Sequence, residues 1–381
     1  MRTDVVIIGG GITGVSTAFH MARAGVDVVL VERGLLGSGS TSKAIGGIRA
    51  SFNHPTNIEI GLYGRQVFST FEEDFDQPVG YTKGGYLYLI DDTIPMEQME
   101  ASVALQNSYG VVSRLIDPAE AHRLSPMINQ DHCVAALWSP DDGRAEPEAA
   151  VAGYARAARR EGATLRTGVT VTGIEVQDGE IRSVETDHEI IETGTVINCA
   201  GAWAPQIGAM VGIDLPIEPY RRQVVITEDA AHTLPSLETL TIDLASAFYF
   251  HQEGRRFTIG FSDPAEKPGF NIRFDPTDWL PRMVEHAGRC APDLLDLGIR
   301  SSYAGLYAVT PDHNQIVGEH TRIGRFLYAA GFSGHGFQMG PAMGRILTSL
   351  YLGEAPFIDV SSLGVERFEG EGSQRHEAFI V

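Results

Sequence analysis

The sequence predicts an α/β fold that begins with a βαβ unit and is joined to an α+β region with an antiparallel sheet. Near the N-terminus, the apolar run 4–8 is followed by a helix-like stretch from Val15 to Ala24 and by a second apolar run, 26–31. Farther along, strand-like runs fall at 81–90, 222–227, 239–250 and 256–261. The last three follow one another with no long helix between them, which favours antiparallel pairing. The length of 381 residues is enough for one large domain or two medium ones, each with its own core.

Between the first strand and the helix lies a glycine-rich turn, Gly9-Gly-Gly-Ile-Thr-Gly14, which contains the pattern GxGxxG. In a βαβ unit, Gly9 permits the tight turn, Gly11 lets the backbone approach a pyrophosphate, and Gly14 lets the helix pack closely on the strand. The phosphates of a dinucleotide would lie at the helix N-terminus, where unpaired N–H groups attract anions. Glu32, 18 residues after Gly14, is placed to accept the ribose hydroxyls. This acid disfavours the 2′-phosphate of NADP and leaves FAD or NAD.

Three later segments favour FAD over NAD. Residues 37–49 form a polar, glycine-rich stretch suited to wrap an extended cofactor, and 195–201 is a strand that ends in small residues, which allow a ligand close to the backbone. Near the C-terminus, the strand 326–330 runs into the glycine-rich turn 331–336 and a helix over 337–351. The N-terminus of that helix would face the negative charge that develops on a reduced flavin. A dehydrogenase that uses NAD does not need this second junction of strand, turn and helix.

The remaining elements fit the same plan. Residues 146–160 predict a helix, with acidic residues in its first turn and basic residues in its last turn, which complement the helix dipole. The runs 169–176 and 181–185 flank Asp178-Gly179, which predicts a β-hairpin. We expect the tail after about Phe368 to be loosely held.

Composition and charge exclude several classes of function. With 29 basic and 49 acidic residues the formal net charge is −20, so neither nucleic acid nor an anionic membrane is an expected partner. No apolar run approaches the ~20 residues of an integral membrane segment, and we expect no signal peptide, because the first strand begins at about residue 4. The cysteines, Cys133, Cys199 and Cys290, are few and widely spaced, so we expect a reducing, cytoplasmic location. We expect no metal site, because His335 has no second ligand at a suitable spacing.

The motifs together resemble those of the FAD-dependent D-amino-acid oxidase superfamily, particularly its sarcosine-oxidase-like branch, some members of which are β-subunits of heteromeric dehydrogenases such as proline dehydrogenase. They span nearly the whole chain in the family's order: Gly9–Gly14 with Glu32 and Arg33, then 46–49, 198–203, 219–225, 305–312 and 330–337. The resemblance implies a Rossmann-type FAD-binding domain interleaved with an antiparallel-sheet substrate domain over the flavin. The FAD-binding domain would be discontinuous, over 1–80, 143–212 and 312–381, and the substrate domain would comprise 81–142 and 213–311.

The resemblance also implies which residues contact FAD. Val171 would contact the adenine through its backbone, and Gln338 would lie at the edge of the flavin pyrimidine. Some relatives attach FAD covalently to a cysteine two residues before the tyrosine of the Gly-Leu-Tyr motif, but Gly305 stands at that position here, so we predict non-covalent FAD. The full set of expected FAD contacts is Gly9, Gly11, Ile12, Thr13, Gly14, Glu32, Arg33, Ser40, Thr41, Ser42, Val171, Gly201, Gly331, Gly334, His335, Gly336 and Gln338.

By resemblance, the reaction is oxidation of the C–N bond of an amine or amino acid, such as a secondary amine, an N-methyl amino acid or an imino acid. Hydride would pass from the carbon next to the nitrogen to flavin N5, and the imine would then hydrolyse. The flavin carries the difficult chemistry, while the protein supplies binding, orientation and charge. Arg49 resembles the arginine beside the flavin ring, Tyr249 and Tyr307 match substrate-pocket positions, and the other catalytic candidates are Gln338 and His251. Tyr249 lies in an aromatic run and could equally be a core residue.

The resemblance does not define how the substrate's carboxylate is held. Relatives that oxidise sarcosine use an arginine three residues beyond the one matching Arg49 and a lysine after Gly-Phe, and here these positions are Phe52 and Gln338. Relatives that oxidise glycine and D-amino acids use a different arginine, which this chain also lacks at the matching position. A desolvated carboxylate prefers a bidentate arginine. The substrate is therefore held through Arg49, Arg222 or His251, or it lacks an α-carboxylate.

One position bears on the electron acceptor. Oxidase relatives place a lysine over the flavin that aids the reaction with O₂, and aligning 256–260 puts Thr258 there, so no cation would stabilise superoxide-like charge. We therefore hypothesise a dehydrogenase that passes electrons to a quinone or a partner protein rather than to O₂. Three alternatives stay open: an oxidase that produces hydrogen peroxide, a flavin-bearing β-subunit active only in a hetero-oligomer, and a flavin monooxygenase reduced by NAD(P)H.

Overall fold

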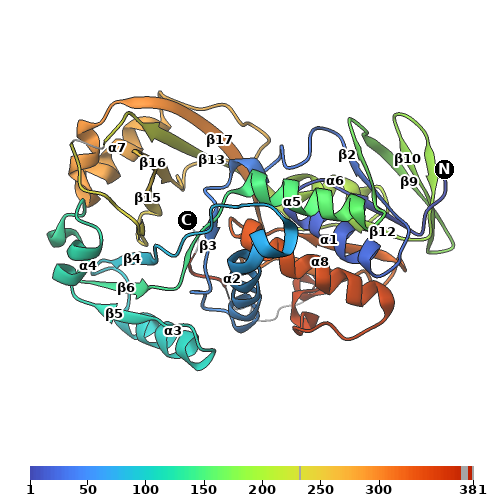
Figure 1. The fold of residues 1–381 in the computed structure, drawn as a ribbon, viewed down its shortest axis with the longest axis horizontal. Coiled ribbons are helices and arrows are strands. Elements are labelled where there is room, and N and C mark those ends of the chain that lie inside the picture. The colour runs from blue at the N-terminus through green and yellow to red at the C-terminus, as the bar shows by residue number, and fades with distance from the viewer. Residues whose placement is uncertain (231–232, 370–375, 380–381) are drawn as a thin grey trace.

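The computed structural model describes residues 1–230, 233–369 and 376–379. Two large sheets lie toward opposite ends of the long axis, with helices against and between them (Figure 1). The first has six strands in the order β18 (Ile316–Glu319), β19 (Phe326–Ala330), β12 (Val196–Asn198), β1 (Val5–Ile8), β2 (Val28–Glu32) and β8 (Thr164–Thr167). The second has eight, in the order β17 (Ile299–Val309), β13 (Glu218–Thr227), β16 (Arg256–Phe261), β15 (Phe248–Glu253), β14 (Leu240–Asp243), β4 (Tyr86–Ile90), β6 (Ala135–Ser139) and β5 (Arg114–Ile116).

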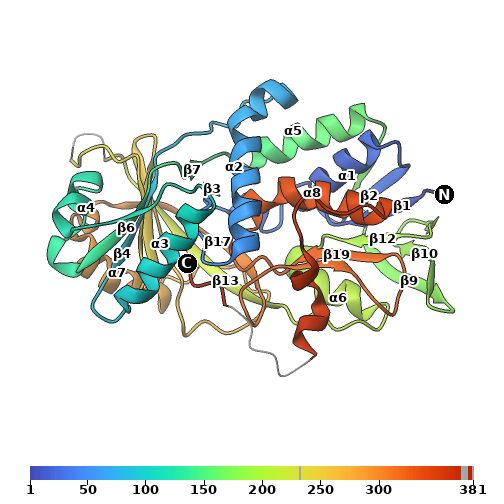
Figure 2. The ribbon, with the colours of Figure 1, turned by 90° about the horizontal axis from the view of Figure 1, so that it is seen from below.

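The first sheet contains the predicted βαβ unit, which consists of β1, α1 (Ile12–Arg23) and β2. β1 pairs in parallel with β2 and β12, and its β-branched residues are buried on both faces. Alternate residues of β1 contribute to two different apolar cores, one of which also holds residues of α1, α5 (Pro147–Arg160) and α8 (Gly336–Leu352). These three helices lie side by side (Figure 2). α1 begins at Ile12, earlier than the predicted Val15, so its first turn directly follows the glycine-rich turn.

Several smaller predictions are confirmed. The hairpin of β9 (Val171–Gln177) and β10 (Glu180–Thr186) turns at Asp178 and Gly179, whose φ angles of 54° and 78° are the left-handed values that a two-residue hairpin turn requires. β11 (Ile190–Glu192) adds a third strand beside β10. α5 covers the predicted helix 146–160, and β19 with α8 forms the predicted second junction of strand, turn and helix.

Two expectations about the second sheet are wrong, and a third, its antiparallel pairing, is confirmed except at one strand pair. The run 239–250 is not one strand, because a turn at 244–247, in which the N–H of Ala247 donates to the carbonyl of Asp243 at 2.8 Å, separates β14 from β15. The strand predicted over 81–90 begins only at Tyr86, after Gly85 with φ of 74°. The sheet is also not wholly antiparallel: β14 pairs in parallel with β4, which enters from a distant part of the chain rather than through a hairpin.

The remaining elements connect and cover the two sheets. α2 (Pro55–Phe75) lies between the two sheets (Figure 2). The short strands β3 (Gly47–Ile48) and β7 (Gly143–Arg144) pair with each other. The other helices are α3 (Met96–Ser108), α4 (Pro118–Leu124), α6 (Ala204–Ala209) and α7 (Trp279–Cys290). Because strands of the two sheets alternate along the chain, each sheet is assembled from separated segments; the domain boundaries given above stay a prediction.

The expectation of a loosely held tail is wrong for the part of it that the structure describes. Residues 370–375 and 380–381 lie outside the described residues, but 376–379 are packed into the molecule. The side chains of Glu377 and Phe379 are only 1% and 2% exposed. Glu377 accepts a hydrogen bond from the side chain of Asn57 at 3.0 Å, and the ring of Phe379 packs against that of Tyr88 with centroids 5.1 Å apart.

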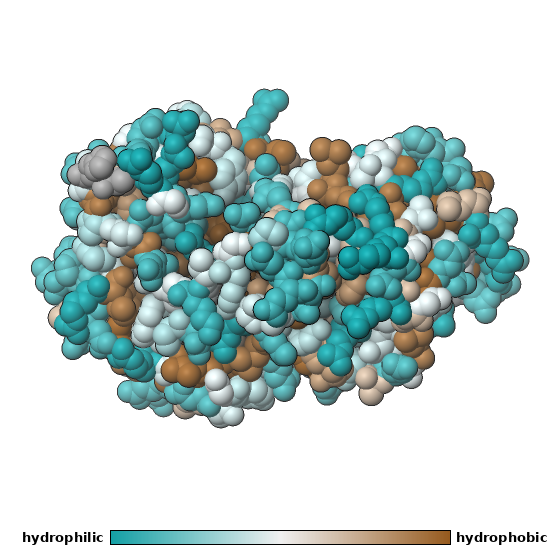
Figure 3. Space-filling model, viewed as in Figure 1, coloured by the Kyte–Doolittle hydropathy of each residue, from teal (hydrophilic) through white to brown (hydrophobic). Residues whose placement is uncertain are grey.

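The surface agrees with the composition. The face shown in Figure 3 is mostly hydrophilic, with apolar side chains in scattered groups. Among the described residues, none of the helices combines the length and the apolar character that a membrane span needs. The three cysteines are buried and unpaired, and burial raises the pKa of the Cys199 thiol to about 12, so it is not a ready nucleophile.

Candidate active site

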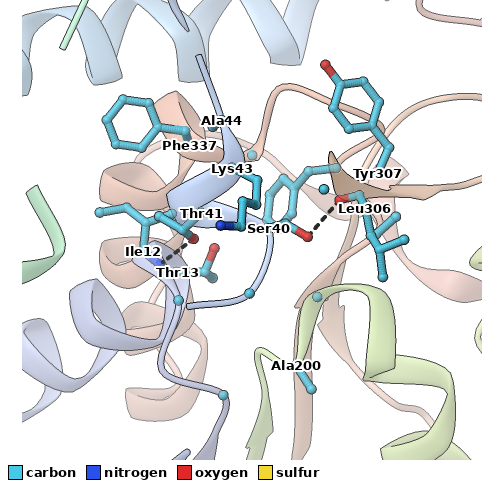
Figure 4. A pocket seen from close by; sticks show the side chains of 18 of the residues that line it. Ile12, Thr13, Ser40, Thr41, Lys43, Ala44, Ala200, Leu306, Tyr307 and Phe337 are labelled. Carbon is cyan, nitrogen blue, oxygen red and sulfur yellow. Dashed lines mark hydrogen bonds between the residues drawn. The ribbon is translucent and has the colours of Figure 1, made fainter. Parts of the chain in front are cut away.

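A cavity of about 470 Å³ lies where the two sheets approach each other. Its walls come from the turn after β1, the end of β2 and the start of β9 on one side, and from β13, β15 and β17 on the other. Figure 4 shows the side chains of Ile12, Thr13 and Thr41 opposite those of Leu306 and Tyr307. The predicted FAD contacts that line the cavity are Gly9, Gly11, Ile12, Thr13, Glu32, Arg33, Ser40, Thr41, Val171, Gly201, Gly334, His335, Gly336 and Gln338.

The glycine-rich turn has the geometry that its pattern requires. Gly9 has φ of 109°, and a Cβ built on it would overlap the backbone carbonyl of Cys199 at the end of β12. A Cβ on Gly14 would overlap the carbonyl oxygen of Gly9. The carboxylate of Glu32 accepts hydrogen bonds from the N–H groups of Gly10 and Gly34 at 2.8 and 2.7 Å, so it also fixes this turn. A backbone cradle of this shape fits the phosphates and ribose of a dinucleotide.

The segment after β2 ties the first sheet to the second. Thr41 Oγ1 accepts a hydrogen bond from the N–H of Ile12 at the start of α1, and Ser40 Oγ donates to the carbonyl of Leu306 on β17 at 2.7 Å (Figure 4). Lys43, which the sequence did not single out, also lines the cavity. A Cβ built on Gly305 would overlap the side chain of Lys43, so these two residues are packed together.

Four predicted site residues do not line the cavity wall. Gly14 instead provides close packing under the turn, and Gly331, with φ of 72°, packs against Thr310. Ser42 lies outside the lining, and its N–H donates to the carbonyl of Gly37. His251, two residues beyond Tyr249 on β15, is buried away from the lining; burial and the charge of Arg144 hold its pKa well below the ordinary value.

Arg49 is buried at the cavity wall and its hydrogen bonds are made within the chain. One terminal nitrogen donates to the carbonyl of Ser51 at 2.8 Å, and the other donates to the carbonyl of Phe379. The guanidinium lies 3.9 Å from the ring centroid of Phe52. Burial opposes its charge, but Tyr88, Glu377 and other neighbours leave its pKa raised. The backbone N–H of Arg49 donates to the side-chain oxygen of Gln338, which brings these two predicted residues together.

A buried carboxylate that sequence reasoning missed supports this wall. Asp142 is fully buried, and it accepts hydrogen bonds from the N–H of Ala50 at 2.9 Å and from the hydroxyl of Ser51 at 2.6 Å. The Ser51 hydroxyl is also 2.8 Å from that of Tyr88. A terminal nitrogen of Arg65 lies 3.6 Å from Asp142 Oδ1. No local sequence pattern predicts these contacts, because Asp142 is more than ninety residues from Ala50 in the chain.

The other end of the cavity is aromatic and holds a second arginine. Tyr249 and Tyr307 both line the cavity, and their role in a substrate pocket stays a prediction. Burial raises the pKa of both phenols, so both hydroxyls stay protonated near neutral pH. The guanidinium of Arg222, on β13, lies 5.1 Å from the ring centroid of Tyr307. A Cβ on Gly260 would overlap the ring of Tyr249, so this glycine makes room for the tyrosine.

The position used to argue about the electron acceptor does not face the cavity. Thr258 is buried on β16, paired with Ile226 and His251, and does not line the cavity. Lys43, Arg49 and Arg222 all do. The argument from Thr258 against a reaction with O₂ therefore loses its basis.

His335 is held in place at the start of α8 without a charge. One ring nitrogen is 3.2 Å from the carbonyl of His313 and the other is 3.2 Å from the sulfur of Met339. Burial and the neighbouring Arg49 lower its pKa to about 3, so the ring is neutral at physiological pH. Within the described part of the chain, no three His, Cys, Asp or Glu side chains are grouped as metal ligands would be.

The buried acid Glu377 predicts a pH dependence of stability. Burial raises its pKa above the ordinary value for a glutamate, so the folded state favours the protonated form. Its contribution to stability is therefore present below the ordinary pKa and is lost as pH rises through the raised one. We expect Glu377→Gln, which cannot ionise, to gain stability relative to the unmodified protein as pH rises from about 4 to about 8. Thermal unfolding at each pH measures the difference.

In a matched control variant, the change in stability with pH should have the opposite sign. The N–H of Thr170 holds the pKa of the exposed Asp187 below its ordinary value. Asp187→Asn should therefore lose stability, relative to the unmodified protein, as pH rises from about 2 to about 5, through the lowered pKa and the ordinary aspartate value of about 3.9. A difference for Glu377→Gln that stays flat, or falls as it does for Asp187→Asn, would contradict the assignment.

The fold and cavity define a class: a dinucleotide-binding oxidoreductase whose cofactor groove is part of a larger cavity lined by tyrosines and arginines. The chain belongs to the family described as FAD dependent oxidoreductase (DAO), which matches residues 4–350. This confirms the resemblance found in the sequence, the class of fold, and FAD as the cofactor.

The chain is similar to several enzymes of known activity. It is 30% identical to the mitochondrial sarcosine dehydrogenase of Mus musculus over 384 residues, and 30% identical to the mitochondrial dimethylglycine dehydrogenase of the same species over 392 residues. Each match covers 96% of this chain but only 41% and 44% of the relative, so the chain spans less than half the length of these proteins. Among solved structures, L-proline dehydrogenase from P.horikoshii is 34% identical with a TM-score of 0.89, covering 97% of this chain and 98% of that one. The cytoplasmic location stays a prediction.

Proposed function

We propose that the chain oxidises the C–N bond of an N-alkyl amino acid or a cyclic imino acid. The observation that carries the proposal is that Tyr249, Tyr307 and Arg222 line the same cavity as the residues expected to hold FAD. The similar enzymes act on sarcosine, dimethylglycine and L-proline, which share a substituted nitrogen and a carboxylate. When bound, FAD would accept the hydride that leaves the carbon next to the nitrogen.

The chain's own residues would bind and orient the substrate. The apolar side chains of Leu240 and Ile242, together with the two tyrosines, would exclude water from the reacting carbon. Arg49 and the N-terminus of α8 would place positive potential where the cofactor gains negative charge. A protonated tyrosine could donate a hydrogen bond to the substrate but could not serve as a strong base at neutral pH.

Anaerobic reduction of the flavin, followed at the absorbance band of the oxidised cofactor, tests this function. We expect sarcosine, dimethylglycine or L-proline to bleach the isolated holoprotein, and lactate and NADPH not to bleach it. Bleaching by NADPH alone would instead support a monooxygenase. No bleaching by any amino acid without a second chain would support a subunit that works only in a hetero-oligomer.

The same reduced protein identifies the acceptor. We propose a dehydrogenase, supported by the activities of the similar enzymes. We expect a soluble quinone to reoxidise the flavin rapidly and air to reoxidise it slowly. Fast, stoichiometric formation of hydrogen peroxide in air would establish an oxidase instead.

We also propose that FAD is bound without a covalent bond. Gly305 offers no side chain, and Lys43 covers it. Acid denaturation should therefore release the yellow colour into the supernatant. Colour that remains with the precipitated protein would overturn this proposal.

A further inference from the structure

Arg49 is poorly placed to bind a substrate carboxylate. Its two terminal nitrogens donate to the carbonyls of Ser51 and Phe379, and one of them also lies 3.5 Å from the hydroxyl of Tyr88. A flat face of its guanidinium is covered by Phe52. The polar contacts use three of the five N–H donors of the guanidinium, so Arg49 has fewer left for a bidentate carboxylate. His251, the second candidate, does not line the cavity.

Arg222 also lines the cavity, but fewer of its donors are used within the chain. Its Nε is buried without a hydrogen-bond partner among the described residues. One terminal nitrogen donates to the backbone carbonyl of Arg221 at 3.0 Å. No carboxylate of the described chain lies within ion-pair distance of it, and burial lowers its pKa. A buried guanidinium with an unpaired donor is expensive, so its presence needs a compensating partner.

The adjacent residue on β13, Arg221, is an arginine whose partners all lie within the chain. Arg221, on the opposite face of β13, lies 2.9 Å from Glu266 and 3.6 Å from Asp275, and it donates to the carbonyl of Arg273 at 2.8 Å. Its charge is thus neutralised within the chain. Arg222 receives no such pairing and faces the cavity instead. The two arginines are neighbours on one strand, but only Arg221 has acidic partners within ion-pair distance among the described residues.

The groups around Arg222 complete an anion site. Tyr307 packs against its guanidinium, and Tyr249 lines the same end of the cavity. Both phenols are protonated, so each can donate a hydrogen bond to a carboxylate oxygen. We infer that Arg222 binds the α-carboxylate of the substrate, which makes this end of the cavity specific for amino acids over simple amines. This inference rests on the proposed function.

Binding of a non-reacting carboxylate tests the site without turnover. Tetrahydro-2-furoate, in which oxygen replaces the nitrogen of proline, should perturb the flavin spectrum of the holoprotein, whereas tetrahydrofurfuryl alcohol should not. Arg222→Met should weaken binding of the carboxylate about 100-fold, as expected for loss of one partner of a buried charge pair. Arg222→Lys should restore part of the affinity. Arg221→Met, the matched control, should leave it unchanged.

Anaerobic flavin reduction by L-proline and by pyrrolidine separates this inference from the proposed function. The unmodified protein should prefer L-proline, and Arg222→Met should remove that preference mainly by raising the half-saturating concentration of proline. If carboxylate binding and the preference survive in both Arg222 variants, the inference is wrong even though C–N oxidation stands. If no amine bleaches the flavin but the furoate still binds through Arg222, the proposed function fails and the anion site stands.

Discussion

Replacing Gly9 with alanine is expected to lower the affinity for FAD about 100-fold or more. At φ of 109° an L-residue is strained, and the new Cβ would overlap the backbone carbonyl of Cys199, which belongs to the end of a central strand and cannot rotate away. The turn after β1 would have to move toward the cavity. That movement misplaces the N–H groups at the start of α1, which are the groups that should bind the phosphates.

Gly25→Ala is the matched control for this change. Gly25 also has a positive φ, 81°, but nothing lies within 4 Å of a Cβ built on it, and it follows the C-terminus of α1, far from the cavity. The substitution should cost about 1 kcal/mol of stability and leave FAD affinity unchanged. Quenching of flavin fluorescence on titration with apoprotein measures both affinities. Equal FAD binding by the two variants would contradict the role assigned to Gly9.

The parts of the site that the sequence predicts correctly depend on local backbone geometry. The turn Gly9–Gly14, the hairpin at Asp178-Gly179 and the junction before α8 each require glycine or a left-handed residue at fixed positions in a short segment. At such positions, steric clashes within a few residues of the chain determine which residue types are allowed. The spacing of the glycines in the sequence is therefore enough to predict the turn. Glu32 follows in the same way from the end of β2.

The parts that the sequence does not predict depend on pairings between distant segments. Thr258 and His251 are paired between β15 and β16 on the same face of the sheet as Tyr249, but farther along the strands, where the cavity does not reach. Asp142 and Phe379 reach Arg49 and its neighbours from 92 and 330 residues away. No periodicity within a single segment encodes such contacts. The resemblance found the arginine but not the residues that hold it.

Those distant contacts lead to the second large prediction, Arg49→Met. The change removes the donors to the carbonyls of Ser51 and Phe379 and leaves both buried groups unpaired, so stability should fall by about 3 kcal/mol. It also removes a cation from the cavity wall, where the flavin gains negative charge. Loss of one such stabilising group typically slows the chemical step about 100-fold or more. Urea unfolding and stopped-flow reduction with saturating substrate measure the two effects.

Arg65→Met separates the effect on reduction from the effect on stability. Arg65 lies 3.6 Å from Asp142, but it does not line the main cavity. Its loss should also destabilise the protein, by about 1 kcal/mol, because Asp142 loses a nearby positive charge. Flavin reduction should nevertheless proceed at the original rate in every molecule that retains FAD. If the flavin of Arg49→Met were also reduced at that rate, the role of Arg49 would be limited to holding residues 376–379 in place. The positive potential at the cavity wall would then have to come from Lys43 or from the N-terminus of α8.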